Sequence, residues 1–262
     1  MSEPAKRDSV QSIERALATL ECKADVGGEA GLIEISAATG LPVPTIHRLL
    51  RTLVAVGYVR QEQSRRYTLG PKLIRLGESA QQLVGVWARP LLAELAEVTG
   101  ETANLAMLDG DVVVYVAQVP SAHAMRMFTE VGRRAPAHCT GVGKAILSQL
   151  DESTVRAILS RTGMPAQTPR TITDPDLFVD ELAETRQQGY ALDDGEQELA
   201  VRCIAVPVAQ DRPRFAVSIS GPDSRITGKV IFGAVPALHQ AARRFSEVLG
   251  DTAEHARPAA AT

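Results

Sequence analysis

Hydrophobic positions near the start of the chain recur with the period of an α-helix. Residues 32–39 form a short amphipathic segment that ends at Gly40, a residue that adopts the left-handed turn conformation without strain. Residues 42–54 open with proline, which a first helical turn tolerates, and carry an apolar stripe: Ile46, Leu49, Leu50, Leu53 and Val54. The opposite face holds side chains that can reach phosphates or base edges: Thr45, His47, Arg48, Arg51 and Thr52. This pattern predicts a helix-turn-helix whose second helix enters a major groove.

Two short strand patterns follow the second helix. Tyr58-Val59-Arg60 and Tyr67-Thr68-Leu69 flank a polar turn with Arg65 and Arg66, which predicts a wing and adds two candidate DNA contacts. Upstream, residues 9–21 predict a supporting helix with one apolar face: Val10, Ile13, Leu17 and Leu20. A plain helical hairpin with solvated arginines is the alternative, but the turn, the spacing, the wing and the charge together favour DNA binding.

The rest of the chain predicts a second domain. Near-helical spacing over 71–88 predicts a linker helix, and a separate helix is expected from Arg89-Pro90 to Gly100. The period then changes to that of a β-hairpin over 102–116, around Asp109-Gly110. Further strands are expected at 125–129, 204–208 and 215–220, and helices at 143–149, 151–160, 174–188 and 230–249. We therefore predict an α+β protein, with a winged helix-turn-helix over 1–70, a sheet-containing domain over 89–252 and a disordered tail over 253–262.

Charge is distributed unevenly along the chain. Residues 1–77 carry eleven Lys and Arg against eight Asp and Glu, whereas the remainder carries seventeen against twenty-three. The net charge of −3 therefore conceals a basic front end, which suits contact with nucleic acid. Because this excess is small, we expect at least a dimer, which gathers more phosphate contacts.

Composition argues against several other classes. No apolar run approaches the roughly 18 residues of a membrane span, and the first residues lack the apolar core of a signal peptide, so a cytoplasmic location is expected. Cys22, Cys139 and Cys203 are too widely spaced for a disulfide framework. No Cys-x-x-Cys or His-x-x-x-His spacing occurs, so we expect neither a metal site nor a cofactor.

Three segments of the second domain could line a ligand pocket. Residues 138–144 form a glycine-bearing loop that runs into a helix, which favours an anionic group, although tight turn packing explains the bare motif equally well. Residues 193–198 are acidic and would ordinarily form a solvated loop. Ser218 and Ser220 share one face of an apolar strand, so they either donate to a bound carboxylate or carbonyl or hydrogen-bond neighbouring backbone.

The same segments leave an enzyme or a redox sensor as alternatives. An enzyme would use Cys139 or Cys203 as its nucleophile, next to His138, with Asp193 as the base. Adjacent side chains point apart on a strand, however, and no third orienting group is evident, so we expect no catalytic residues. Redox sensing by the two cysteines would require lowered thiol pKa values.

Motifs in both domains resemble those of the IclR family of bacterial transcription regulators. Those of the first domain are Ser9-Val10-Gln11-Ser12-Ile13-Glu14-Arg15-Ala16, Gly40-Leu41-Pro42, His47-Arg48-Leu49-Leu50 and Tyr67-Thr68-Leu69-Gly70. Those of the second are His138-Cys139-Thr140-Gly141-Val142-Gly143-Lys144-Ala145, Asp193-Asp194, Arg202-Cys203-Ile204-Ala205 and Ser218-Ile219-Ser220-Gly221-Pro222. The resemblance implies a winged helix-turn-helix joined by a helix to a GAF-like effector domain, with dimers or dimers of dimers bound to palindromic operator DNA.

The resemblance also implies where an effector binds. In members that take glyoxylate-like ligands, the contacts match Gly141, Val142, Asp193, Cys203, Ser218 and Ser220, and Ala135 and Val201 match apolar positions of the same pocket. Val43-Pro44 stands where many relatives carry a basic or hydroxyl pair, so register on DNA would depend more on Thr45, Arg48 and the wing. We expect a repressor of a catabolic operon controlled by glyoxylate, another oxo or hydroxy acid, or allantoin; an activator is the alternative.

Overall fold

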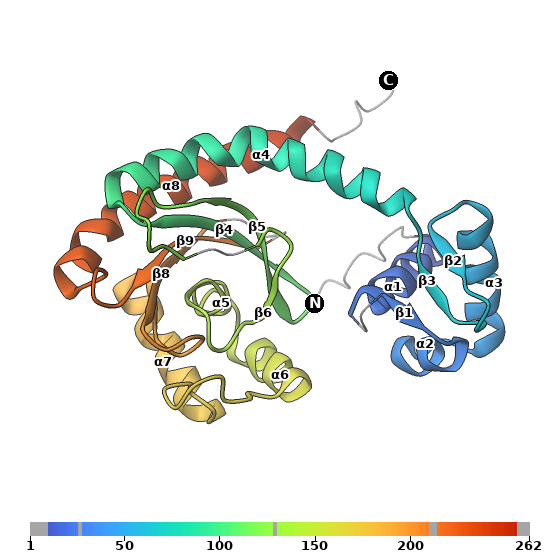
Figure 1. Ribbon diagram of the computed structural model, residues 1–262. Helices are drawn as coiled ribbons and strands as arrows, with labels where there is room; N and C mark the ends of the chain where they lie inside the picture. Colours follow the sequence, from blue (N-terminus) through green and yellow to red (C-terminus); the bar gives the residue numbers. More distant parts are fainter. Residues whose placement is uncertain (1–9, 26–27, 128–129, 210–213, 256–262) are drawn as a thin grey trace, which may run out of the picture. The chain divides into compact units, whose positions relative to one another are not determined.

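The computed structural model describes residues 10–25, 28–127, 130–209 and 214–255 (Figure 1). The chain divides into two compact units, residues 1–80 and 81–262. The long helix α4, Lys72–Thr99, contributes residues to both units. Each unit has a hydrophobic core of its own.

The first unit is the predicted winged helix-turn-helix. Its elements are α1 Gln11–Asp25, β1 Glu29–Ala30, α2 Leu32–Thr39, α3 Val43–Ala55, β2 Val59–Gln61 and β3 Tyr67–Leu69. The three strands form an antiparallel sheet in the order β1-β3-β2. Both wing strands were predicted, whereas β1 was not, because two residues are too few to show a period.

The turn between α2 and α3 is fixed by local interactions. Gly40 ends α2 in the left-handed conformation, with φ of 67°. The Ser36 hydroxyl donates to the carbonyl of Leu41 at 2.6 Å, which ties the turn back to α2. Ile46 and Leu50 of the predicted α3 stripe are then fully buried, while Val54 at its edge is exposed.

The described residues cover only part of the apolar face predicted at α1, where Leu20 packs against the core. Val10, Ile13 and Leu17, which were predicted to form one face of a supporting helix, are each more than half exposed. The α1 side chains buried instead include Thr19 and Lys23. The first unit therefore carries an uncovered hydrophobic surface on α1.

The second unit is a six-stranded antiparallel sheet with helices on both faces. The strand order is β6-β5-β4-β9-β8-β7. Its strands are β4 Thr102–Asp109, β5 Val112–Val119, β6 Arg134–Pro136, β7 Ala191–Asp194, β8 Val201–Pro207 and β9 Phe215–Pro222. Its helices, besides part of α4, are α5 Gly141–Leu147, α6 Glu152–Thr162, α7 Pro175–Gln188 and α8 Gly228–His255.

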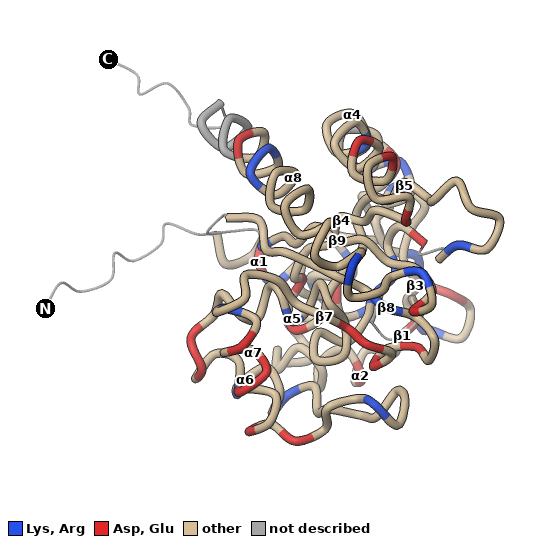
Figure 2. The backbone as a smooth tube through the Cα atoms, turned by 90° about the vertical axis from the view of Figure 1, so that its left-hand side faces the viewer, with Lys and Arg blue, Asp and Glu red and all other residues tan. Residues whose placement is uncertain are grey.

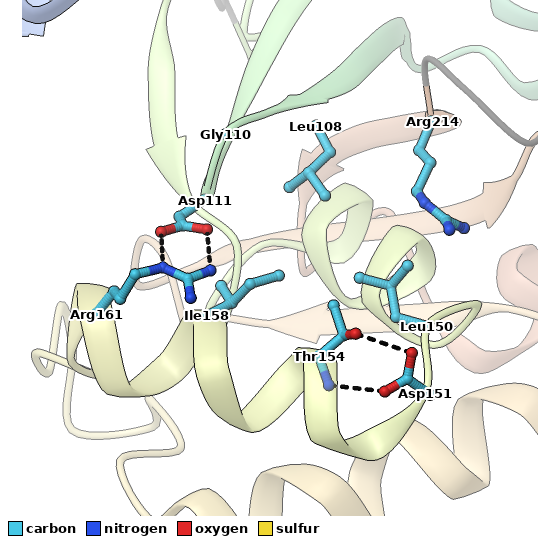
Figure 3. A pocket seen from close by; sticks show the side chains of 9 residues that line it. All are labelled: Leu108, Gly110, Asp111, Leu150, Asp151, Thr154, Ile158, Arg161 and Arg214. Carbon is cyan, nitrogen blue, oxygen red and sulfur yellow. Dashed lines mark hydrogen bonds and ion pairs between the residues drawn. The ribbon is translucent and has the colours of Figure 1, made fainter. Parts of the chain in front are cut away.

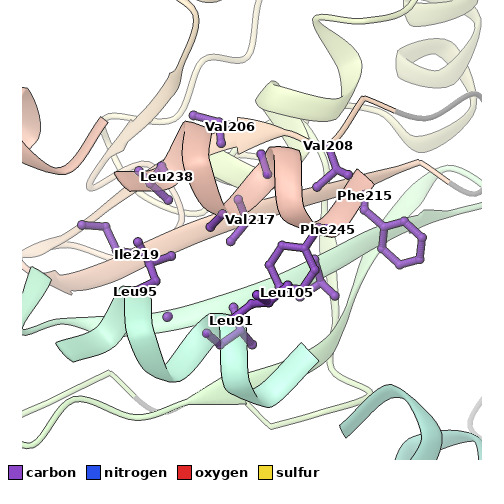
Figure 4. Packing of buried hydrophobic residues seen from close by; sticks show 14 of the residues in the cluster. Leu91, Leu95, Leu105, Val206, Val208, Phe215, Val217, Ile219, Leu238 and Phe245 are labelled. Carbon is purple, nitrogen blue, oxygen red and sulfur yellow. The ribbon is translucent and has the colours of Figure 1, made fainter. Parts of the chain in front are cut away.

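The two faces of this sheet belong to two separate hydrophobic clusters. One face packs against α4 and α8, where Leu91 and Leu95 meet Phe245 over Leu105 and Val217 (Figure 4). The other face packs against α5, α6 and α7, and its strand residues include several alanines. Small side chains on this second face let α5 lie close to the strands.

Several expected elements differ from those observed. α4 runs through Pro90 without the expected break, since Ala88, Leu91 and Leu92 bury one continuous face against the sheet and so offset the lost backbone hydrogen bond. Residues 125–127 are not a strand, and residues 128–129 lie outside the described chain. Strands β6 and β7 were not predicted. Of the tail expected to be disordered from Ala253, residues 253–255 lie in α8, and the rest lies outside the described residues.

Gly143 allows α5 to lie against the segment that precedes it. A Cβ atom at Gly143 would lie 2.1 Å from the carbonyl oxygen of Ala137, a distance at which backbone must move. Gly233 in α8 is a matched contrast, because a Cβ there would meet nothing within 4 Å. Close packing, and not turn geometry, is thus the reason for glycine at 143.

We predict that Gly143→Ala lowers the free energy of unfolding by about 1–3 kcal/mol, because it overpacks a rigid contact. Gly233→Ala should raise it by about 0.5–1 kcal/mol, since alanine is the better helix former. Urea unfolding of the full chain, followed by circular dichroism, measures both. Equal effects of the two substitutions would contradict the packing argument.

Candidate functional site

The outer face of α3 offers two arginines to a ligand. His47, Arg48 and Arg51 are exposed, and no acidic residue occurs in the sequence between Glu34 and Glu62. Among the described residues, no carboxylate lies within ion-pairing distance of Arg48 or Arg51. Both guanidinium groups are therefore available for phosphate or base contacts.

Two further predicted contacts on α3 have less freedom. Thr45 is half-buried in the first turn, below the exposed face. The Thr52 hydroxyl donates to the carbonyl of Arg48 at 3.1 Å but stays exposed. Each can still present its hydroxyl oxygen as an acceptor, which is a weaker interaction than a guanidinium gives.

The two wing arginines differ in their surroundings. Arg65 is exposed at the turn of the wing, where its φ of 62° is left-handed. Arg66 instead pairs with Glu29 at 2.9 Å and with Glu34 at 2.9 Å, which raises the pKa of Arg66 further above its usual value, chiefly through the hydrogen bond to Glu34. Arg66 thus holds the wing against the start of α2, whereas Arg65 has no ion pair with a carboxylate among the described residues.

The register of the second-unit sheet brings the predicted effector residues into one row. Ser220 on β9 lies opposite Cys203 on β8, and Cys203 lies opposite Asp193 on β7. Ser218 stands two residues from Ser220, on the same face of β9. The side chains of all four are buried.

The first turn of α5 covers this row. Thr140 caps the helix by accepting a hydrogen bond from the backbone N–H of Gly143 at 3.2 Å. A Cβ atom at Gly141 would lie 3.0 Å from the sulfur of Cys203, so the α5 backbone approaches the strand closely. Gly141 and Val142 are buried there, beside the predicted polar side chains. The structure therefore brings all six predicted effector positions together.

Alternation along β7 separates the two aspartates of the acidic segment. Asp194 points outward and pairs with Arg202, whose Nε lies 2.7 Å from Asp194 Oδ1. Asp193 points inward, and its Oδ1 accepts from the backbone N–H of Glu196 at 2.8 Å and of Gln197 at 3.3 Å. Burial raises the pKa of Asp193 to about 7, against the effect of these hydrogen bonds. The expected solvated loop is therefore wrong for Asp193, whose side chain is buried.

Burial also removes the reactivity that an enzyme or a redox sensor would need. It raises the thiol pKa values of Cys139 and Cys203 to about 12, so neither forms a thiolate at neutral pH. The Cys139 thiol donates to Gln197 Oε1 at 2.9 Å, while His138 Nε2 lies 3.2 Å from the carbonyl oxygen of Pro165. Among the described residues, no histidine is hydrogen-bonded to either thiol as the base of a nucleophilic cysteine would be.

Three polar residues of the site were not predicted. Asn104 on β4 is buried, and its Nδ2 lies 3.1 Å from Ser220 Oγ and 3.4 Å from Ser218 Oγ. Gln118 on β5 donates to Asn104 Oδ1 at 3.0 Å. Tyr115 lies near Cys203 and Asp193, and burial raises the pKa of its hydroxyl. Polar positions within the predicted hairpin were the available signal, but the pairing of β4 with β9 was not predictable.

Lys144 neutralises the acidic side of the site. Its ammonium group is fully buried and donates to Glu196 at 2.6 Å and to Glu181 at 2.8 Å. Burial alone would lower the pKa of Lys144, but the two carboxylates outweigh it and raise that pKa. Lys144 therefore stays charged and joins α5 to α7 and to the loop after β7.

A separate cavity of about 660 Å³ opens beside α6 and is lined by none of the six predicted effector residues (Figure 3). Leu108, Leu150 and Ile158 form its apolar wall. Arg161 at its rim is engaged by Asp111 through two contacts of 2.7 Å. This pairing satisfies the guanidinium group of Arg161, while Arg214 also lines the cavity.

Surface charge in the second unit includes acidic residues along α6 and α7 (Figure 2). Such a surface repels DNA and leaves contact with it to the first unit. Within the described parts of the chain, no helix is long and apolar enough to cross a membrane. The same residues contain no cluster of His, Cys, Asp and Glu able to hold a metal ion.

Both units match domains of one known protein family. The IclR helix-turn-helix domain matches residues 12–63, and the C-terminal domain of the bacterial transcriptional regulator IclR matches residues 81–247. The transcriptional repressor IclR of Escherichia coli K12 is 39% identical over 235 residues, which cover 86% of each chain. The acetate operon repressor of Salmonella typhimurium is 38% identical over 250 residues, which cover 93% of this chain and 91% of the relative.

Solved structures of the same family also match this chain. The crystal structure of an IclR-type regulator from Silicibacter sp. TM1040 matches with a TM-score of 0.76 and 32% identity, over 91% of this chain and 96% of that one. The predicted architecture and the prediction of a regulator in place of an enzyme are thereby confirmed. The chain belongs to the IclR family of bacterial transcriptional regulators.

Proposed function

We propose that the protein represses a catabolic operon by binding a palindromic operator through its first unit. The observation that supports this best is the exposed face of α3, where Arg48 and Arg51 have no acidic neighbour among the described residues. Arg65 of the wing adds a contact beside them. In this proposal the protein acts in the cytoplasm, where a bacterial operator is found.

The active species in this proposal is at least a dimer. The hydrophobic surface formed by Val10 and by Ile13 and Leu17 of α1 supports it, because a second copy would cover side chains that the described residues of one copy leave exposed. Two copies related by a two-fold axis present two α3 helices to two half-sites. A dimer also doubles the small positive charge of one first unit.

The effector in this proposal is a small carboxylate, of the 2-oxo or 2-hydroxy acid class, held in the second unit. Ser218 and Ser220 would donate to it, and the backbone N–H groups of Gly141 and Val142 would hold its anionic end. Asp193, largely protonated below its pKa of about 7, would donate a further hydrogen bond. The ligand changes operator affinity by binding two conformations of the protein unequally.

Arg48→Ala and Arg51→Ala should each weaken operator binding. If the guanidinium makes a bidentate contact with a guanine edge, its removal should cost about 1–3 kcal/mol of binding free energy, and only for operators with guanine at that position. If the guanidinium touches phosphate, its removal should weaken binding to all DNA sequences. The slope of log affinity against log salt concentration should then fall by about one unit. Fluorescence anisotropy with labelled operator measures both. Arg243→Ala is the matched control, because Arg243 is exposed on α8 and has no carboxylate within ion-pairing distance among the described residues. Wild-type affinity in both α3 variants would exclude α3 as the reading helix.

The double variant Ser218→Ala, Ser220→Ala should lose its response to glyoxylate and pyruvate. Removing both hydroxyls leaves acceptor atoms of the ligand unpaired, at a cost of about 1–3 kcal/mol. Operator binding without ligand should persist, because the serines lie in the other unit. Isothermal titration and operator anisotropy measure the two effects. Undiminished ligand affinity in the double variant would place the effector elsewhere.

Effector affinity should fall as pH rises from about 6 to about 8, by up to about tenfold per unit, because ionised Asp193 repels a carboxylate. Asp193→Asn keeps the oxygen that accepts from Glu196 and Gln197 and should remove this dependence. The raised pKa also favours the folded state only while Asp193 is protonated, so its contribution to stability is lost as pH rises from about 4 to about 7. A pH profile unchanged by Asp193→Asn would refute this role.

A further inference from the structure

A chain of amide hydrogen bonds ends at the two serines. Asn104 lies opposite Ser218 on one side of β4 and opposite Gln118 on the other. Gln118 Nε2 donates to Asn104 Oδ1 at 3.0 Å, and Asn104 Nδ2 faces Ser220 Oγ at 3.1 Å and Ser218 Oγ at 3.4 Å. Asn104 is only 1% exposed, so water does not compete for its amide.

The direction of this chain decides what the serines can do. An amide has a donor end and an acceptor end, and a hydroxyl has one hydrogen to give. Because both Asn104 N–H bonds point at serine oxygens, each serine accepts from Asn104 and keeps its own hydrogen for another partner. The Ser218 hydroxyl donates to the sulfur of Cys203, which lowers the thiol pKa against the larger effect of burial. Because sulfur is a weak acceptor, a ligand oxygen is a better partner for that hydrogen.

We propose that Asn104 and Gln118 are specificity-determining residues that make Ser218 and Ser220 hydrogen-bond donors, so that the site accepts carboxylate or ketone oxygens and rejects amide N–H groups. This inference rests on the proposed effector function. Neither residue needs to touch the ligand: Asn104 orients the serine hydroxyls, and Gln118 orients Asn104. A ligand N–H group and a serine O–H group are both donors. If the N–H group faces the serine, at least one of these two buried donors has no acceptor, so the ligand is rejected.

Gln118, at the end of the hydrogen-bond chain farthest from the serines, gives the sharpest test. A carboxylate only accepts, so in Gln118→Glu the Asn104 amide has to turn round and donate to the new side chain. Asn104 Oδ1 then faces the serines, whose hydroxyls donate to it and no longer to a ligand. The change lies on β5 and alters neither serine, and Gln118 is partly exposed, which lets the charge reach solvent.

The measurement compares pyruvate with pyruvamide, and glyoxylate with its amide, by isothermal titration. Wild type should prefer the acids, and Gln118→Glu should lower that preference by about tenfold or more. Gln240→Glu, exposed on α8, adds the same charge and should leave the preference unchanged. Asn104→Asp places a carboxylate, which can only accept, directly against the serines. It should therefore lower the preference for the acids as Gln118→Glu does, and it is the variant to use if Gln118→Glu fails to fold.

The outcomes separate this inference from the proposed function. If wild type prefers the acids and the serine double variant loses them, but Gln118→Glu and Asn104→Asp keep the wild-type preference, the inference is wrong and the effector site stands. If wild type binds none of the acids, both are wrong. A crystal structure of wild type with pyruvate gives a check without variants: the inference requires both serine hydroxyls on ligand oxygens and the Asn104 amide nitrogen on both serines, and any other arrangement overturns it.

Discussion

The antiparallel register of the second-unit sheet determines both its core and its site. Alternate residues of each strand face opposite sides, so one face carries the cluster that packs under α4 and α8. The other face carries Asp193, Cys203 and Ser220 in one row, with Ser218 two residues from Ser220 on the same face. A shift of one residue in a strand would exchange its two faces and bury polar groups in an apolar core. The pairing that stabilises the fold therefore also assembles the effector site.

Burial of this row requires that its polar atoms satisfy one another. Asp193 accepts from two backbone N–H groups, and Lys144 is paired with Glu181 and Glu196. Glu196 Oε2 is the exception at this site, because it is buried without a hydrogen-bond partner among the described residues. In a region of low dielectric, satisfied groups are rigid, and the removal of one partner affects the rest. The site is thus organised before a ligand arrives.

Local patterns made the first unit predictable and left parts of the second unit hidden. The turn at Gly40, the stripe on α3 and the wing strands depend on residues close in sequence, and the structure contains all of them. The expected break at Pro90 was wrong because packing against the sheet outweighs the local cost of proline.

The site shows the same division between local and long-range information. Its six effector positions came from resemblance to the family, and the strand register brings them together. Asn104 was missed because its partner Ser220 lies 116 residues away. Lys144 lies in the candidate loop, but its pairing with Glu196, 52 residues away, was not predicted, because no local pattern reveals it. Periodicity therefore predicted the buried face of α3 but not that of α1, where Ile13 and Leu17 are exposed, and it does not predict which polar residues meet across elements.

The central claim is that one small carboxylate, bound in the second unit, is thermodynamically linked to operator binding by the first. α4 contributes residues to both units, and the linkage is reciprocal whatever its route. The most direct measurement is a full cycle on wild-type protein: operator affinity with and without saturating pyruvate or glyoxylate, and affinity for that acid with and without operator. The account predicts that the two affinity ratios differ from one and equal each other. An acid that binds equally well to free and operator-bound protein would contradict it.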